Sequence, residues 1–150
     1  MANAYLEKKI AKVSFDPSGD STVRGIASHN LKLALPDNAI ITNAWYDVIT
    51  TFTSATDAAT IALTVNSAGD LKAAIAISAA GDVYDAGIRG CLPGSYAERT
   101  VAGDTAVLDA ASKAASYIKL TAVREVVATV AVEALTAGKL DLFIEYVVGE

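Results

Sequence analysis

The chain has 150 residues, of which 53% are hydrophobic and 19% charged, with a net charge of −5. This length suits one domain with a substantial core, and this composition excludes a largely disordered chain. The acidic balance argues against binding to nucleic acids, which needs a basic face, and the single cysteine excludes an intramolecular disulfide and a cysteine-rich metal site.

Membrane association is not expected either. Charged residues interrupt the apolar runs before they reach the roughly 18 residues that cross a bilayer. The lysine-containing start lacks the apolar stretch of a secretory signal, which predicts retention in a cytoplasm or export by another route. High apolar content with so few charges also suggests that some surface is buried against other subunits.

The first third of the chain predicts strands separated by turns. Residues 4–15 alternate weakly, as a first strand or an arm reaching a neighbour, and the turn formers of 16–20 end them. Residues 22–35 end in alternating leucines, and Pro36 closes this strand because proline cannot donate to a ladder.

Residues 40–53 predict the longest strand, since they are dense in strand formers and lie between polar turns. Both of its faces are partly apolar, so we expect it to be central or covered on both sides. A shorter strand follows at 61–65 after the turn at 54–57. Residues 69–80 fit a helical turn and a short strand equally well.

Residues 81–115 are rich in glycine and predict a long excursion with little regular structure, with a short strand near 96–101 and a helical turn around 108–113. The last third alternates clearly again. There we expect strands at 117–123, 126–132 and 139–148, with turns at 124–125 and 135–138 and a positive φ at Gly138.

These elements predict an all-β fold: an antiparallel β-sandwich, jelly-roll-like, with about eight strands and a long central loop excursion. We expect a single domain over residues 1–150, in which 1–20 are a possible N-terminal arm and 81–115 are the loop-rich excursion.

Residues that carry chemistry are few. His29 is the only histidine, and neither Ser28 nor Cys91 stands in a nucleophile motif, so a structural histidine and an inert thiol are expected. The glycines form no phosphate-binding loop. Trp45 and the tyrosines would suit a sugar-binding face, although core packing is the commoner fate of aromatic side chains. We therefore expect no enzyme, no catalytic residues and no cofactor.

Acidic residues offer one possible metal site. Asp82 and Asp85, with Asp104 and Asp109, provide oxygen ligands of the kind calcium prefers, but the EF-hand spacing is absent. No metal is expected. Asp57 is expected to cap a turn through its side chain.

Three segments resemble a family of tailed-bacteriophage virion proteins, namely head decoration (cement) proteins or head-fibre proteins. They are LPDNAIITNAWYDVITTFTSATDAATIAL at 35–63, IAISAAGDVYDAG at 75–87 and TVAVEALTAGKLDLFIEYVV at 129–148. The resemblance spans about two-thirds of the chain, and its motifs are strands and turns. It implies small β-rich proteins without an active site that attach, often as trimers, to capsid shells.

The resemblance implies a decoration protein on the capsid exterior that is made in the host cytoplasm. It also implies the major capsid protein as partner, a homo-oligomer in the form of a trimer, and no bound nucleic acid or membrane. Candidate contact residues are Tyr5, Leu6 and Ile10 in the arm and Tyr84, Ile88, Leu92 and Tyr96 in the excursion. Each has packing within its own subunit as the alternative. Other open functions are a head-fibre base and an adhesin or carbohydrate-binding β-sandwich module.

Overall fold

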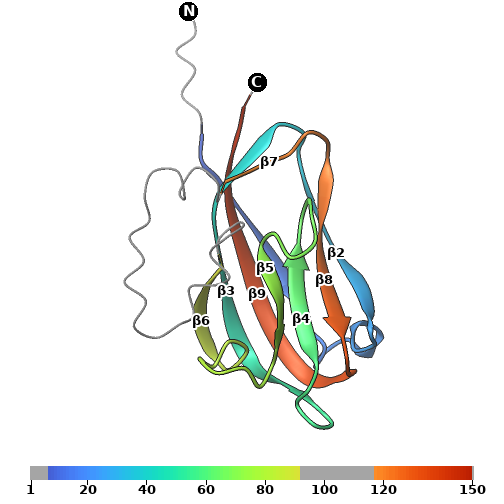
Figure 1. Ribbon diagram of the computed structural model, residues 1–150. Helices are drawn as coiled ribbons and strands as arrows, with labels where there is room; N and C mark the ends of the chain where they lie inside the picture. The colour runs from blue at the N-terminus through green and yellow to red at the C-terminus, as the bar shows by residue number, and fades with distance from the viewer. Residues whose placement is uncertain (1–6, 92–116, 150) are drawn as a thin grey trace, which may run out of the picture.

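The computed structural model describes residues 7–91 and 117–149, which form two antiparallel sheets packed face to face (Figure 1). The first sheet contains β1 (Lys9–Phe15), β9 (Leu135–Val148), β3 (Ala39–Ser54) and β6 (Gly87–Cys91), in that order, and the short β7 (Ile118–Lys119) pairs with β3. The second sheet contains β2 (Ala27–Leu35), β8 (Arg124–Ala131), β4 (Thr60–Thr64) and β5 (Lys72–Ala76). A 3-10 turn, η1 (Ser21–Val23), precedes β2.

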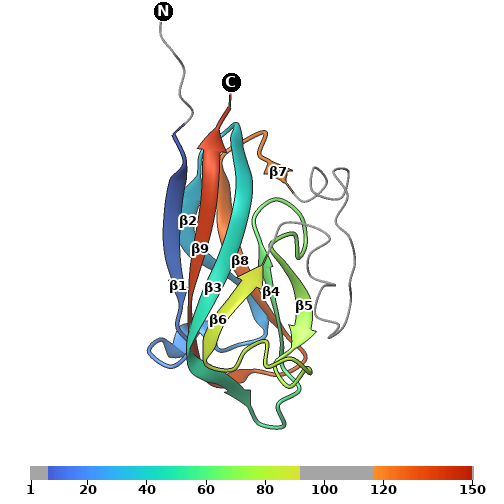
Figure 2. The ribbon, with the colours of Figure 1, turned by 90° about the vertical axis from the view of Figure 1, so that its left-hand side faces the viewer.

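The chain passes back and forth between the sheets, which makes the fold a jelly roll. Strands β1, β3, β6 and β9 lie in one layer, and β2, β4, β5 and β8 lie in the other, as Figure 2 shows with the first sheet toward the viewer. This order of two interleaved Greek keys confirms the predicted all-β antiparallel sandwich. Helices able to cross a lipid bilayer are absent from residues 7–91 and 117–149.

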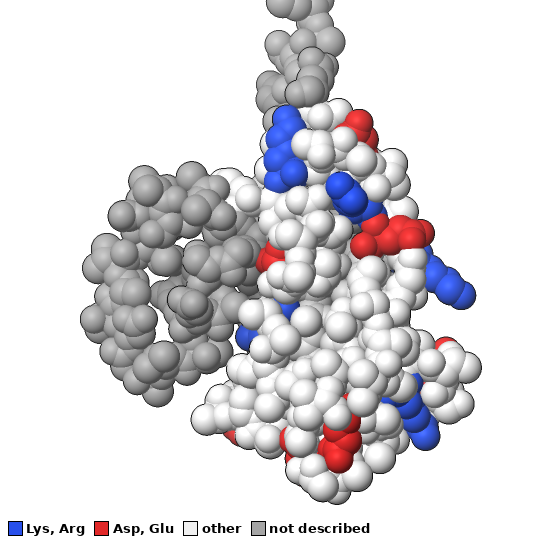
Figure 3. Space-filling view, turned by 45° about the vertical axis from the view of Figure 1, so that its right-hand side comes forward, with Lys and Arg blue, Asp and Glu red and all other residues white. Residues whose placement is uncertain are grey.

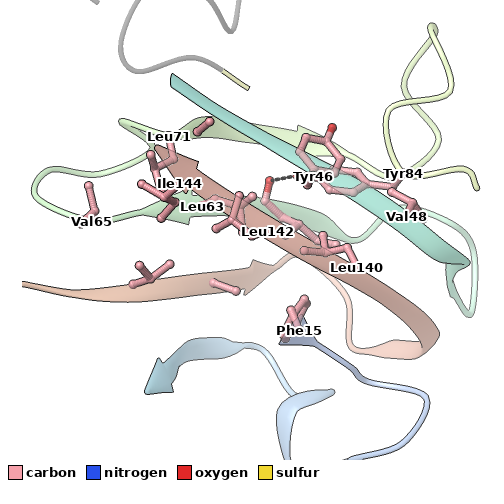
Figure 4. Packing of buried hydrophobic residues seen from close by; sticks show 14 of the residues in the cluster. Phe15, Tyr46, Val48, Leu63, Val65, Leu71, Tyr84, Leu140, Leu142 and Ile144 are labelled. Atoms are coloured by element: carbon pink, nitrogen blue, oxygen red, sulfur yellow. Dashed lines mark hydrogen bonds between the residues drawn. The ribbon is translucent and has the colours of Figure 1, made fainter. Parts of the chain in front are cut away.

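Alternating side chains of both sheets fill the core between them (Figure 4). The alternating leucine and isoleucine positions of the last strand are fully buried, and so are the alternating positions of β4 and β8. Examples of these buried residues are Ile61, Leu63, Val126, Ala128, Val130, Leu140, Leu142 and Ile144.

Aromatic side chains make up one part of the core. Tyr84 is fully buried, packs edge-on against Phe52 at 5.6 Å and donates a hydrogen bond of 3.0 Å to the carbonyl of Ile61. Tyr46 stacks on Tyr84 at 5.9 Å between ring centroids. Tyr84 therefore has no surface to offer a neighbouring protein, and we withdraw it from the contact residues.

Several predicted boundaries are wrong. The turn expected at 124–125 is the start of β8, where Glu125 lies opposite Ala34, and most of the strand expected at 117–123 is absent apart from β7. The turn expected at 135–138 belongs to β9, because the chain reverses earlier, at 132–134. Polar or small residues at the end of a strand carry the same sequence signal as a turn.

The middle of the chain is more regular than predicted. Residues 69–80, which the pattern left undecided, contain strand β5, and the side chain of Asp70 accepts the backbone N–H groups of Val65, Asn66 and Ser67 at 2.9 Å to close the preceding loop. The predicted excursion begins later than expected, because β6 pairs with β3. The strand near 96–101 and the helical turn around 108–113 lie outside the described residues.

The N-terminal segment is part of the sandwich. Strand β1 pairs with β9 along its full length, from Lys9 opposite Tyr146 to Phe15 opposite Leu140. The first-strand interpretation of this segment is therefore correct for residues 9–15, which do not form an arm.

The reversal between β8 and β9 is tied to the loop between β3 and β4. Glu133 accepts hydrogen bonds from the hydroxyl of Ser54, from the backbone N–H of Thr56 at 3.0 Å and from that of Ala58 at 3.3 Å. The bond from Ser54, followed by that from Thr56, lowers the pKa of Glu133. One carboxylate thus joins two loops at the same end of the molecule.

Val132, in this reversal, is a strained position. Its φ is +69°, and the backbone N–H of Glu133 donates to the carbonyl of Ala131 at 2.8 Å, which forms a γ-turn that β-branched residues rarely adopt. We expect Val132→Asn to raise the free energy of unfolding by about 1 kcal/mol, because asparagine tolerates positive φ. Urea unfolding measures this. Val123→Asn, at another exposed valine without positive φ, should change it by less than about 0.5 kcal/mol.

Gly138 is the second backbone constraint. Its φ is +140°, which confirms the predicted positive φ, although the residue lies inside β9 and not in a turn. A Cβ at this position would come within 2.2 Å of the Phe52 ring. We expect Gly138→Ala to cost about 2–5 kcal/mol from overpacking and strain, again measured by urea unfolding. Gly90→Ala is the matched control, since a Cβ there meets no atom within 4 Å. Equal effects of the two substitutions would contradict this account.

Candidate interaction surface

The outward face of the first sheet combines apolar and charged side chains. Tyr46 and Val48 of β3 are buried in the core, so Trp45 and Asp47 between them point outward. Strand pairing places side chains of β1, β9 and β6 beside them. We call this surface the β3 face and define it by Ile10, Lys12, Trp45, Asp47, Ile49, Ile88, Asp141 and Phe143.

An aromatic pair occupies the middle of the β3 face. Trp45 and Phe143 lie opposite each other in the register of β3 and β9, and their rings stack with centroids 5.5 Å apart and planes 9° from parallel. The ammonium group of Lys12 lies 5.8 Å from the centroid of the Phe143 ring, a cation–π contact. Three neighbouring strands thus contribute one continuous row of contacts.

Two carboxylates on β9 are paired with lysines of the N-terminal segment. Lys12 lies 2.8 Å from Asp141, whose carboxylate also accepts a hydrogen bond from the Ser14 hydroxyl. Lys8 lies 3.4 Å from Glu145. Burial alone raises the pKa of Asp141, but the bonds from Lys12 and Ser14 outweigh that effect, and the pKa lies below its usual value of 3.8.

Asp47 differs from these acids. It lies directly opposite Asp141 on β9 and opposite Ile88 on β6. Within the residues that the structure describes, its carboxylate has neither a hydrogen bond nor an ion pair. Two like charges facing each other across a strand pair destabilise the sheet. The β3 face therefore carries an unbalanced negative charge.

Exposed isoleucines lie on the same face as this charge. Ile88 is 71% exposed, Ile10 is 59% exposed, and Ile49, next to Val48 on β3, is 49% exposed. The long strand lies between β9 and β6 inside its sheet, as predicted, but the described residues cover it on one side only. An apolar sheet face left open in one subunit is typical of a protein interaction site.

Two of the predicted contact residues, Ile10 and Ile88, lie on the β3 face, on the edge strands β1 and β6. Tyr5, Leu6, Leu92 and Tyr96 lie outside the described residues. The prediction missed Trp45, Asp47, Ile49 and Phe143 as a set. The apolar outward positions of the long strand signalled them, but the register that brings β9 and β6 beside them was needed to group them.

The residues considered for catalysis are separated. His29 belongs to the second sheet, where its Nε2 lies 2.8 Å from the Gly25 carbonyl and its ring stacks on Phe15. The hydroxyl of Ser28 bonds to that of Thr129 at 3.0 Å. Cys91 lies in the first sheet, opposite Ala44. A nucleophile, base and acid are not assembled among these residues.

The aspartates considered for calcium are only partly brought together. Asp82 and Asp85 line one shallow pocket with Asp57, but the described residues contain no group of three that could hold a metal ion. Asp104 and Asp109 lie outside the described residues. The cap predicted for Asp57 is confirmed, because its carboxylate accepts the backbone N–H of Ser54 at 3.2 Å.

A second view of the molecule shows how the charges are spread. On the face drawn in Figure 3, basic and acidic side chains are interspersed over a largely uncharged surface. A continuous basic patch, which phosphate backbones require, is not formed by the described residues on that face. The expectation that the chain binds no nucleic acid stays a prediction.

No family model matches the chain, and no curated protein matches it in sequence. Its fold is similar to chains in three solved phage structures. These are the acidic stable capsid structure of Helicobacter pylori bacteriophage KHP30 (15% identity, TM-score 0.61), the capsid asymmetric unit of cyanophage Pam1 (16%, 0.63) and the capsid of Ralstonia phage GP4 (18%, 0.55).

In each comparison the similarity extends over nearly the whole length of both chains. They cover 97%, 99% and 100% of this chain and 92%, 90% and 90% of the respective phage chains. At such low identity they establish a shared fold. The expected resemblance is thus confirmed at the level of the fold, since each similar structure is that of a phage capsid.

The pKa of Asp141 predicts how stability depends on pH. Because the folded-state pKa lies below the unfolded value near 3.8, the stabilisation is complete above about pH 5 and is lost as the pH falls through 3.8 toward the folded pKa. We expect Asp141→Asn to cost about 1–2 kcal/mol at pH 7 and to flatten this acid-side loss. Urea unfolding from pH 7 to pH 2.5 measures both effects.

The control for this experiment is Asp85→Asn, which removes an exposed carboxylate for which the structure records no ion pair among the described residues. It should leave the pH profile unchanged. An Asp141→Asn profile as steep as that of the unaltered protein would show that the Lys12 and Ser14 contacts do not stabilise the fold.

Proposed function

We propose that this chain is a structural protein of a bacteriophage virion, and that it serves as a capsid decoration (cement) protein on the outside of the head. The observation that supports this most is the similarity of the whole chain, in both directions of coverage, to chains in three phage capsid structures. A shared fold does not by itself give a function, so the surface must carry the rest of the argument.

The surface favours binding by area over chemistry. Residues with catalytic potential are dispersed among the described part of the chain, whereas the β3 face presents Trp45, Ile49 and Ile88 on a rigid sheet. Specific protein interfaces bury about 800 Å² per partner around an apolar centre. A sandwich that attaches through such a face adds contacts across the shell and opposes its expansion by packaged DNA.

Further exposed apolar residues support contacts with more than one neighbour. Ile26 and Val132, which are 59% and 67% exposed, lie near the end where β2 begins and β8 ends. Tyr117, Val123 and Val148 are exposed toward the opposite end, where β7 and the C-terminus lie (Figure 1). A cement protein that binds the major capsid protein and also forms a homotrimer needs several such areas.

The structure bears on one alternative function, that of a carbohydrate-binding module. Its sugar platform would be Trp45, but this residue is half-buried and one face of its ring already stacks on Phe143. A sugar could therefore stack on only one face of the Trp45 ring. A head-fibre base or adhesin remains an outcome of the test below.

The test uses particles of the virus that encodes the chain. We expect quantitative mass spectrometry of purified mature particles to find the chain in a fixed ratio to the major capsid protein, and cryo-electron microscopy to place a jelly roll of its size on the outer shell. Light scattering of the purified chain is expected to give the mass of a trimer.

Particles made without the chain serve as the control. They should release their DNA at a lower temperature, and added purified chain should restore the release temperature of complete particles. Absence of the chain from mature particles would reject a virion role. Presence of the chain only at the base of fibres would reject the cement role in favour of the head-fibre alternative.

A further inference from the structure

We infer that the β3 face binds a partner surface that presents a basic side chain, preferably an arginine, within an apolar patch, and that Asp47 accepts this cation. The inference rests on the proposed function, under which the partner is the major capsid protein. It identifies the face that attaches and the chemistry that the shell must offer.

The first argument is the unbalanced charge. Asp47 and Asp141 face each other across β3 and β9, and among the described residues a cation is found for Asp141 alone, through Lys12 at 2.8 Å. Cross-strand pairs of like charge cost stability, and the cost falls when a counter-charge approaches. A cation from a partner would relieve a repulsion that the isolated subunit retains.

The cations nearest in sequence and register do not serve Asp47. Lys8 binds Glu145, and Lys139 lies 3.3 Å from Asp16. Arg89 follows Ile88 on β6, but its guanidinium donates to the carbonyls of Asp82 at 2.9 Å and Ile88 at 3.1 Å. The described residues therefore leave the carboxylate of Asp47 available to a partner.

The second argument is the apolar frame. Ile88 lies opposite Asp47, and Trp45 and Ile49 lie two residues before and after it on β3. A partner that covers these side chains removes water from around the carboxylate, which strengthens its attraction to a cation. A guanidinium also binds a carboxylate through two parallel hydrogen bonds and stacks on aromatic rings such as that of Trp45. Arginine therefore suits this site better than lysine.

The same charge argues against a second copy of this chain as the occupant. A two-fold contact centred on Asp47 would bring Asp47 of one subunit toward Asp47 of the other, with the neighbouring Asp141 residues close by. Like charges would then meet in a desolvated interface, which opposes association. The complementary surface is therefore that of a different protein.

The experiment measures binding of the full-length chain to particles made without it, by co-sedimentation over a range of concentrations. We expect Asp47→Lys to weaken binding by about 10- to 100-fold and Asp47→Asn by about 3- to 10-fold, whereas Asp47→Glu retains most of the affinity. Asp37→Lys, which reverses an exposed charge in the loop between β2 and β3, is the matched control and should bind normally.

Two readouts separate recognition from folding. Asp47→Asn should unfold at the same urea concentration as the unaltered chain or at a higher one, because it removes the repulsion with Asp141. Its binding should also depend less on salt, because an ion pair has been lost. Loss of binding together with loss of stability in this variant would overturn the inference.

The remaining outcomes are also decisive. Normal binding of Asp47→Lys would overturn the inference and leave the proposed function intact, since the chain would attach by another face. A change in the mass of the free oligomer, with normal attachment, would overturn it in favour of contact between copies. Failure of the unaltered chain to bind particles would reject the proposed function and the inference with it.

Discussion

The pairing of β3 with β9 determines both the core and the outward surface of this protein. The two long strands lie side by side at the centre of the first sheet, with Tyr46 opposite Leu142 and Val48 opposite Leu140 on the inner side. The same register sets Trp45 opposite Phe143 and Asp47 opposite Asp141 on the outer side. A slip of one residue would exchange the two faces, so burial of the inner set fixes the composition of the outer set.

Carboxylates hold the loops that connect the strands. Asp70 accepts three backbone N–H groups at the turn between β4 and β5, and Glu133 joins the reversal before β9 to the loop after β3. Asp16 similarly accepts the N–H of Gly19. Part of the acidic excess of the chain thus has a structural use, because side-chain oxygens replace strand partners where the backbone leaves the sheet. The net charge alone therefore says little about partners.

The fold could be predicted from sequence because the inner positions alternate so regularly. Leu140, Leu142 and Ile144 indicated one strand, and Ile61 and Leu63 another, and both sets are buried. Strand ends were less predictable. Arg124 and Glu125 are both exposed at the start of β8, and polarity alone does not distinguish that position from a turn. The interaction surface was found only in part, because Ile10 and Ile88 are 78 positions apart and meet on one face only through the order of β1, β9, β3 and β6.

The features that do not help the isolated subunit lie on its outward face and at one of its ends. Ile88 exposes most of its surface, Asp47 faces another carboxylate, and Val132 holds a backbone conformation that a β-branched residue disfavours. None of these features stabilises the folded monomer, although the core and the loop anchors follow the ordinary rules of packing and hydrogen bonding. Proteins break such rules mainly where function requires it. Departures from these rules at exposed positions of the described residues are what the proposed attachment to another protein would require.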